Sequence, residues 1–156
     1  MRRIKAEDNE WIMTIAQLHE TQLYEQGFVS EVTSFSTGLR AEMIYRRLYY
    51  EDDLIEAVFD HDQLAGVVWG HYDDQNQTVL IEFLYVEPEY RHQHIGTQLK
   101  QNLEQWAEEQ GASAITSTVK VHNTEMVRLN QHLGYDIDQY VMRKSLTTDS
   151  EPNDKE

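Results

Sequence analysis

The stretch from Leu84 to Leu99 constrains the fold of this chain most, because it joins two kinds of hydrophobic pattern through a short polar loop. A largely apolar run over residues 79–86 leads into the loop, and Pro88 closes it, which is typical of a strand end. Apolar residues then recur at helical spacing, at Ile95, Leu99, Leu103 and Trp106. A helix that starts after a strand points unpaired N–H groups and the positive end of its dipole at one spot. The sequence therefore predicts a phosphate-binding loop between these two elements.

This stretch resembles the acyl-CoA-binding motif of the GNAT superfamily of N-acetyltransferases. In that motif a strand ending V-x-P is followed by Gln or Arg, two residues, Gly, one residue, and Gly or Ala. The matching positions here are Val86, Pro88, Arg91, Ile95, Gly96 and Leu99. His94 departs from the pattern, because it stands where the family usually has its first Gly. The resemblance runs from about Leu64 to Leu146, and the alternative is an ordinary strand-to-helix crossover in an α/β domain.

Periodicity and turn residues predict an alternation of helices and strands along the rest of the chain. The expected elements are a strand at Arg2–Ala6, a helix from Asp8 or Asn9 to Gly27, a helix capped by Ser36 or Thr37, strands at Leu54–Phe59, Leu64–Tyr72 and Thr78–Val86, a helix at Ile95–Gln110, a strand at Ala114–Val121, a helix at Thr124–Leu133 capped by Asn123, and a final strand or strand pair at Tyr135–Leu146. Periodicity alone gives an α/β or α+β fold. The GNAT resemblance implies a mixed, mostly antiparallel central sheet flanked by helices.

Length and composition narrow the class of protein. The 156 residues predict one domain over residues 1–146, followed by a disordered acidic tail over residues 147–156. The formal charge of −15, from 13 basic and 28 acidic residues, argues against nucleic acid as a partner, because phosphate binding needs a basic surface. The same charge favours a cationic substrate, although it is also explained by solubility alone. The sequence has no cysteine, no membrane-spanning run and no signal-like segment, so we expect a cytoplasmic protein that cannot form a cysteine acyl-enzyme.

The resemblance implies that the loop holds the pyrophosphate of acetyl-CoA, mainly through its backbone. The residues expected to contact it are Arg91, His92, Gln93, His94, Ile95, Gly96 and Thr97. The two histidines either add partial positive charge near the phosphate or are plain exposed loop residues. No metal is expected here, because the loop has no carboxylate or cysteine at ligand spacing.

The strand before the loop carries the expected catalytic base. Glu82 is the one charged residue in its apolar run, and burial there would raise the pKa of its carboxyl toward a useful range. The alternative is an outward-facing strand glutamate or a partner in a salt bridge. Family members splay this strand at a bulge, so the resemblance implies that the main chain of Leu84, Tyr85 and Val86 polarises the acyl carbonyl and meets the pantetheine arm.

The segment from Asn123 to Tyr135 matches the family pattern N-x-x-A-x-x-L-Y-x-x-x-G-F, except that Asn130 replaces the tyrosine that often serves the leaving thiolate. Asn130 can hydrogen-bond the sulfur but cannot supply a proton by acid catalysis. Protonation of the thiolate is then left to solvent, Tyr135 or His132. Asn123 resembles the family residue that meets the pantetheine arm, and its alternative role is the helix N-cap.

These observations predict an N-acetyltransferase that moves the acetyl group of acetyl-CoA to a primary amine by direct attack. The expected acceptor is a small cationic amine, such as a polyamine or an aminoglycoside-like molecule. The alternatives are a protein or peptide amine, or a GNAT-fold module that binds acyl-CoA without turnover. The resemblance also makes a homodimer plausible, since GNAT domains often pair through their C-terminal strands.

Overall fold

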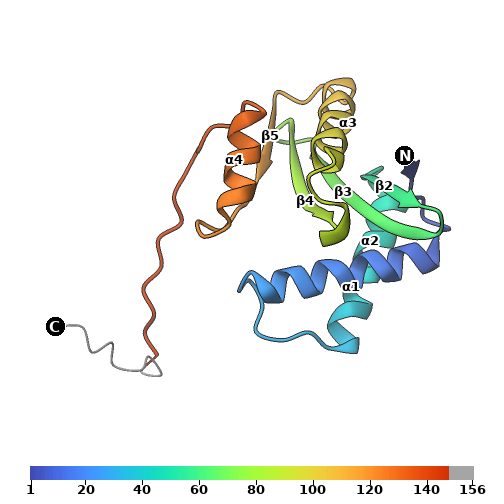
Figure 1. Cartoon of the computed structure of the whole chain (residues 1–156), viewed down its shortest axis with the longest axis horizontal. Helices are drawn as coiled ribbons and strands as arrows, with labels where there is room; N and C mark the ends of the chain where they lie inside the picture. Colours follow the sequence, from blue (N-terminus) through green and yellow to red (C-terminus); the bar gives the residue numbers. More distant parts are fainter. Residues whose placement is uncertain (148–156) are drawn as a thin grey trace.

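A five-stranded sheet in the order β1-β2-β3-β4-β5 forms the centre of the molecule (Figure 1), seen in a computed structural model that describes residues 1–147. The elements are β1 (Arg2–Arg3), α1 (Asn9–Glu25), α2 (Ser34–Tyr50), β2 (Leu54–Asp60), β3 (Gln63–Asp73), β4 (Thr78–Val86), a 3-10 turn at Pro88–Tyr90, α3 (Ile95–Glu109), β5 (Ala114–Ser117) and α4 (Thr124–His132). Neighbouring strands are antiparallel except β4 and β5, which run parallel. The predicted mixed, mostly antiparallel sheet is confirmed.

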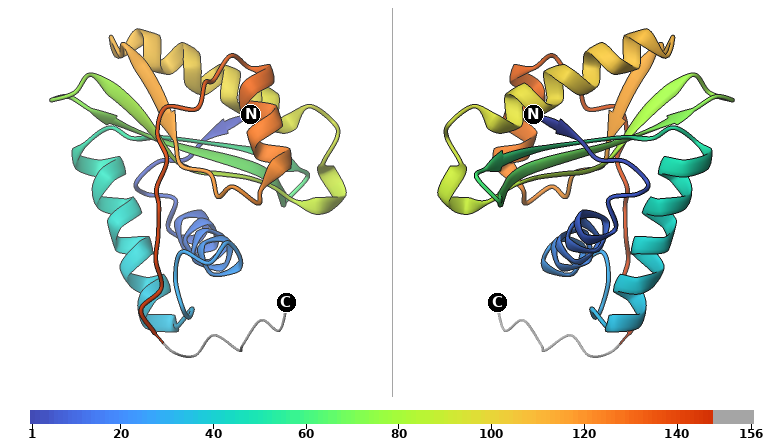
Figure 2. Two further views of the ribbon diagram at one scale, coloured as in Figure 1. Left: turned by 90° about the vertical axis from the view of Figure 1, so that its left-hand side faces the viewer. Right: turned by 90° about the vertical axis from the view of Figure 1, so that its right-hand side faces the viewer.

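Helices cover both faces of the sheet: α1 and α2 lie on one side, and α3 and α4 on the other (Figure 2). Alternate residues of β3 divide between two cores, because successive strand side chains point to opposite faces. Val67 and Trp69 pack with α1 and α2, while Val68 packs with α3. Helix α3 also lies close to β3, since a Cβ on Gly70 would come within 2.8 Å of the Leu103 side chain.

A bulge and a loss of pairing open the sheet along β4. Trp69 pairs with Phe83 and the next residue of β3 pairs with Ile81, so Glu82 is the extra residue of the bulge. On its other edge β4 pairs with β5 only from Thr78 to Ile81. Within residues 1–147 the rest of that edge, from Glu82 to Val86, has no partner strand. The two parallel strands therefore diverge beside the bulge, as the resemblance implied.

Most predicted elements are confirmed to within a few residues. Glycines with a left-handed backbone follow α1, α3 and α4, at Gly27, Gly111 and Gly134. The predicted cap of α2, Ser36 or Thr37, is wrong by three or four residues. Thr33 caps the helix, and Ser36 serves as the third helical residue of a capping box, with Thr33 Oγ1 accepting from Ser36 N at 2.9 Å. None of the helices described over residues 1–147 combines the length and hydropathy needed to cross a bilayer.

The predicted final strand over residues 135–146 is wrong. The chain leaves α4 and runs away from the sheet (Figure 1), and its apolar side chains are exposed, among them Tyr140, Val141 and Met142. Alternating side chains are compatible with an extended backbone, but a strand also needs a partner edge, which the pattern does not specify. Of the predicted acidic tail, only Thr147 belongs to the described residues.

Candidate active site

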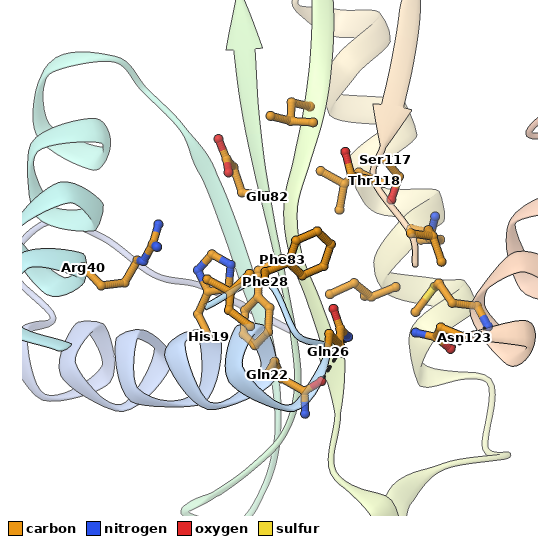
Figure 3. Close-up of a pocket in the computed structure, with 17 residues that line it drawn as sticks. His19, Gln22, Gln26, Phe28, Arg40, Glu82, Phe83, Ser117, Thr118 and Asn123 are labelled. Atoms are coloured by element: carbon orange, nitrogen blue, oxygen red, sulfur yellow. Dashed lines mark hydrogen bonds between the residues drawn. The ribbon is translucent and has the colours of Figure 1, made fainter. Parts of the chain in front are cut away.

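A cavity of about 350 Å³ lies where β4 and β5 diverge (Figure 3). Its walls come from α1, α2, β4, α3, β5 and α4. The lining side chains used below are His19, Arg40, Glu82, Leu84, Lys100, Ser117 and Asn123. The chain thus gathers charged and polar groups from six elements at the opening of its sheet.

Glu82 lies at the bulge of β4 and lines this cavity, as expected of a base near the acceptor. Its side chain is 17% exposed, and Oε1 accepts a hydrogen bond from Arg47 Nη1 at 2.5 Å. Arg47 reaches it from α2, across the ring of Trp69. Glu82 is therefore a salt-bridge partner, which was the alternative to its role as base, and the salt bridge is compatible with that role. The sequence analysis did not predict the cation that holds this carboxylate.

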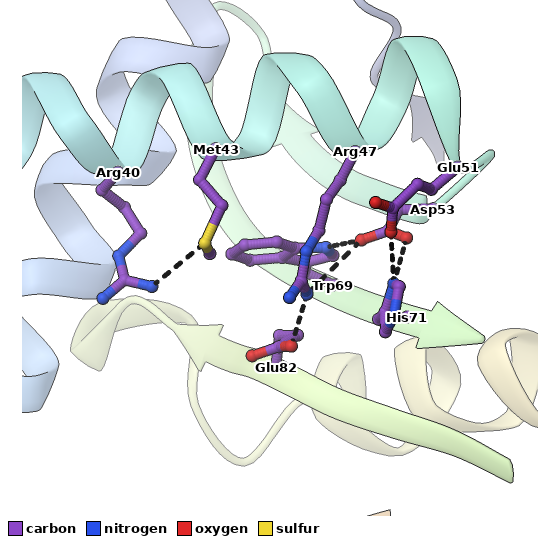
Figure 4. Close-up of polar contacts among 8 residues, drawn as sticks. All are labelled: Arg40, Met43, Arg47, Glu51, Asp53, Trp69, His71 and Glu82. Carbon is purple, nitrogen blue, oxygen red and sulfur yellow. Dashed lines mark hydrogen bonds and ion pairs between the residues drawn. The ribbon is translucent and has the colours of Figure 1, made fainter. Parts of the chain in front are cut away.

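Arg47 also belongs to a polar network on the α2 side of the sheet (Figure 4). The carboxylate of Asp53 is fully buried and accepts hydrogen bonds from Trp69 Nε1 at 2.7 Å and His71 Nδ1 at 2.6 Å, with Arg47 Nη1 4.0 Å away. Burial raises the pKa of Asp53, against the opposing effect of its hydrogen bonds with His71 and Trp69 and of the nearby Arg47. Glu51 completes a group with Asp53 and His71 whose ligand atoms lie within 4.8 Å of one another. Both oxygens of Asp53 already accept hydrogen bonds, so the group is satisfied without a metal.

His19 was not predicted as a site residue, because its spacing placed it on the apolar side of α1. It lines the cavity, and its ring stacks on Phe83 with centroids 4.6 Å apart. Burial, assisted by Arg40, lowers the pKa of His19 to about 3, so the imidazole is neutral. Its Nδ1 is buried without a hydrogen-bond partner in the described chain. A neutral ring with a free nitrogen can accept or donate a hydrogen bond to a bound molecule.

Lys100 is the second unpredicted residue of the cavity. Its side chain is fully buried on α3, and Nζ donates to Asn130 Oδ1 at 2.5 Å. Nζ also lies 4.2 Å from the centroid of the Tyr135 ring. Burial lowers the pKa of Lys100 to about 8. A signal was available in the sequence, since Lys100 shares the apolar face of α3 with Leu103, three residues on.

The predicted residues Asn130 and Tyr135 lie behind Lys100 and are not among those that line the cavity. Asn130 is buried and accepts the hydrogen bond from Lys100. Burial raises the pKa of Tyr135 to about 12, and its hydroxyl has no hydrogen-bond partner within residues 1–147. A direct role for either residue at the thiolate stays a prediction.

Asn123 fulfils one of its two predicted roles: it caps α4, with Oδ1 accepting from Met126 N at 3.3 Å. It also lines the cavity, which keeps the predicted contact with pantetheine open. Leu84 lines the same cavity. Tyr85 packs instead against the core on the α1 and α2 side, and Val86 ends β4.

The predicted phosphate loop, residues 91–97, lies beyond the cavity at the start of α3. The first hydrogen bond of α3 runs from Gln98 N to His94 O at 3.0 Å. The N–H groups of the first turn, before Gln98, therefore have no acceptor within the helix. His94 is the N-cap and has a left-handed backbone, with φ 63°, and His92 has φ 64°. The loop therefore adopts the conformation for which the family usually has glycine, at some cost in strain. Arg91 supports it, since Nε donates to the carbonyl of Val86 at 3.0 Å.

The bulge at Glu82 lies beside the cavity, and the chain continues from there along β4 and through the loop to the start of α3 at Gly96. This order suits a long ligand with a reactive end at the bulge and an anionic part at the helix start. The fold and the site therefore define a protein that can hold a long, partly anionic ligand in the opening of a mixed sheet.

Comparison with known proteins identifies the family. The model of the acetyltransferase (GNAT) family matches residues 15–135, and the chain belongs to this family. The family implies an acyltransferase that uses acetyl-CoA and an amine acceptor. A comparison with curated proteins gave no match.

Solved structures agree with this assignment. A GNAT family acetyltransferase from Staphylococcus aureus subsp. aureus shares 38% sequence identity; the match covers 75% of this chain and 98% of that one, with a TM-score of 0.71. An acetyl transferase from Pyrococcus furiosus shares 24% identity over 93% of this chain and 99% of that one, with a TM-score of 0.71. An aminoglycoside acetyltransferase from an uncultured soil metagenomic sample shares 13% sequence identity over 94% of this chain and 97% of that one, with a TM-score of 0.68. The last two, at these identities, show a shared fold alone.

Proposed function

We propose that this acetyltransferase moves the acetyl group of acetyl-CoA to the primary amine of a small cationic acceptor, such as a polyamine or an aminoglycoside-like molecule. The observation that carries the proposal is the cavity at the divergence of β4 and β5, with the carboxylate of Glu82 at its wall. The amine attacks directly in one ternary complex, since the chain has no cysteine to form an acyl-enzyme.

Groups of this chain are placed to bind the pyrophosphate and the pantetheine arm, to polarise the acyl carbonyl and to deprotonate the acceptor. The first N–H groups of α3, with Arg91 to Thr97, hold the pyrophosphate. The unpaired edge of β4 at Leu84 offers main-chain donors to the acyl carbonyl and the pantetheine arm. Glu82 takes the proton from the acceptor ammonium, directly or through water. Asn123 contacts the pantetheine arm from the start of α4.

The charge of the chain supports a cationic acceptor. The net charge of −15 attracts cations over several ångströms, and a second hollow at the turn between β3 and β4 is lined by Glu51, Asp73 and Asp74. An aminoglycoside acetyltransferase is among the proteins that share the fold, which is consistent with this class of acceptor. A protein or peptide amine is the alternative within the same chemistry.

A panel assay tests the proposal. Release of the CoA thiol from acetyl-CoA is followed with spermidine, an aminoglycoside and a lysine-containing peptide as acceptors. We expect turnover with at least one small cation, above the rate with the peptide. Turnover with the peptide alone would move the acceptor to the protein class. Tight binding of acetyl-CoA with no turnover on any amine would indicate a binding module, for which the departures at His94 and Asn130 are the reason.

We also propose that the chain forms a homodimer. The outer edge of β5 has no partner within residues 1–147, and the segment after α4 leaves Tyr140, Val141 and Met142 exposed. Unpaired edges and exposed apolar side chains favour association with a second copy. Sedimentation equilibrium tests this proposal, and a mass equal to that of one chain at all concentrations would refute it.

A further inference from the structure

Lys100 is a buried cation with a neutral partner. Its side chain is 0% exposed, and its one side-chain hydrogen bond to residues 1–147 is to the amide oxygen of Asn130, at 2.5 Å. No ion pair to Lys100 is found within residues 1–147, unlike Arg40 and Arg47, which pair with Glu20 and Glu82. A buried ammonium that forms no ion pair is costly, so its presence calls for an explanation.

The position of Lys100 supplies one. The side chain comes from α3 and lines the cavity together with Leu84 and Asn123, the two predicted contacts of the pantetheine arm. Three groups fix its ammonium: the helix that carries it, the amide of Asn130 and the face of the Tyr135 ring, whose centroid lies 4.2 Å from Nζ. A cation held in this way is preorganised to face negative charge that develops in the cavity.

We propose that Lys100 is the catalytic residue that stabilises and protonates the leaving thiolate of CoA, and that Asn130 is the residue that positions its ammonium. This inference rests on the proposed function and deepens it. It assigns the one task for which the sequence offered only solvent, Tyr135 or His132.

The step balances in atoms and electrons. The acceptor amine forms the C–N bond, the C–S bond breaks, and its electron pair leaves on sulfur. Lys100 Nζ donates one proton to that sulfur and becomes a neutral amine. The acceptor ammonium loses two protons, one before and one after the attack, and both go through Glu82 to solvent, while Lys100 takes one proton back through the cavity that it lines. One proton is therefore released overall. The net products are the amide and the free thiol.

The acidity of the group fits this role. Burial lowers the pKa of Lys100 to about 8, with Glu104, one turn along α3, acting in the opposite direction. An alkyl thiol such as that of cysteine ionises at about pH 8.5, and proton transfer is efficient between groups of similar acidity. The other titratable or charged groups around it are Tyr135 behind α3 and, across the cavity, Glu82, His19 and Arg40. The pKa of Tyr135, raised to about 12, makes the tyrosine the weaker acid.

The test uses bound CoA and needs no acceptor. The near-ultraviolet absorbance of the thiolate is followed against pH for CoA bound to the wild type, Lys100→Met and Lys100→Gln. Lys5→Met is the matched control, because Lys5 is exposed and does not line the cavity. A buried cation beside the sulfur should lower the pH at which the thiol ionises by about one unit or more. We expect this shift in the wild type and the control, and its loss in both Lys100 variants.

Two further measurements separate the outcomes. An analogue of CoA without sulfur should bind the wild type and Lys100→Met within a factor of about three, while kcat falls about 100-fold in the variant and the basic limb of its pH profile disappears. Equal thiol ionisation in wild type and Lys100→Met, with CoA bound to both, would overturn the role of Lys100 and leave the proposed function intact. Failure of the wild type to bind CoA at all would overturn the proposed function, and this inference with it.

Discussion

Two buried polar clusters, one on each face of the sheet, each hold a cation, but with different partners. On the α2 side, Arg47 stands between the carboxylates of Glu82 and Asp53, and Asp53 also accepts two further hydrogen bonds. On the α3 side, Lys100 has a neutral amide as its partner and an aromatic face beside it. In the first cluster the cation forms ion pairs with carboxylates, whereas in the second the cation has no ion-pair partner within residues 1–147.

The difference indicates which cluster is structural and which is reactive. A network of ion pairs stabilises the folded state only while all its members are present, so it behaves as part of the scaffold. A buried cation that forms no ion pair lowers stability, and a fold retains it where charge must be met during function. Glu82 combines the two roles, because it is paired with Arg47 in the first cluster and also lines the cavity.

The largest expected effect tests the first cluster. Replacing Arg47 by Met leaves Asp53 and Glu82 without their cation, and breaking a buried pair in this way should lower the free energy of unfolding by about 3 kcal/mol at pH 7. The loss should shrink at acidic pH, because protonation of Asp53 relieves the unpaired charge. Urea denaturation measures it, with Arg46→Met as control, since Arg46 is the exposed neighbour. Lys100→Met should show no loss, and equal losses in the two variants would erase the contrast.

The next effect concerns the residue shared by the cluster and the cavity. Replacing Glu82 by Gln preserves shape and removes the carboxylate, so kcat/KM should fall about 100-fold and the acid limb of the pH profile should disappear. Steady-state kinetics over pH 5 to 9 measure both changes. An unchanged profile would remove Glu82 as the base and leave it with a structural role alone.

A third effect tests the cation of the second cluster through stability. The pKa of Lys100 is about 8 in the folded protein and 10.5 in the unfolded chain. Between these values the unfolded chain binds more protons than the folded one, so the free energy of unfolding should rise with pH, by about 2 kcal/mol from pH 8 to pH 10. Above pH 10 the raised pKa of Tyr135 acts in the opposite direction. Denaturation of wild type and Lys100→Met across this range should show the rise in the wild type and a flat response in the variant.

The smallest effect concerns Asn123, which caps α4 and also lines the cavity. Asn123→Ala removes the cap of α4 and should cost about 1 kcal/mol of unfolding free energy. Asn123→Ser restores a capping hydroxyl and should recover that stability. If Asn123 also contacts the pantetheine arm, the Ser variant should still bind CoA more weakly than the wild type in calorimetry. Full recovery of affinity would limit Asn123 to capping.

The local parts of this structure could be predicted, and the parts that depend on distant contacts could not. Glu82, Gly96 and Asn123 stand in strand, helix-start and cap patterns that span a few residues, and the structure has those elements. Arg47 and Lys100 act through partners 35 and 30 residues away, at Glu82 and Asn130, which no local pattern joins. The final strand failed for the same reason, because its pattern specifies no partner edge.

Thermal denaturation with and without acetyl-CoA tests the central claim most directly, with CoA alone as a control. Ligand at about 100 times its dissociation constant should stabilise the fold by roughly 2.7 kcal/mol, which for a domain of this size is a rise in Tm of several degrees. We expect this rise with both ligands, despite the left-handed histidines of the phosphate loop. No rise at millimolar acetyl-CoA would contradict the account, since the cavity and the start of α3 would then have no donor to hold.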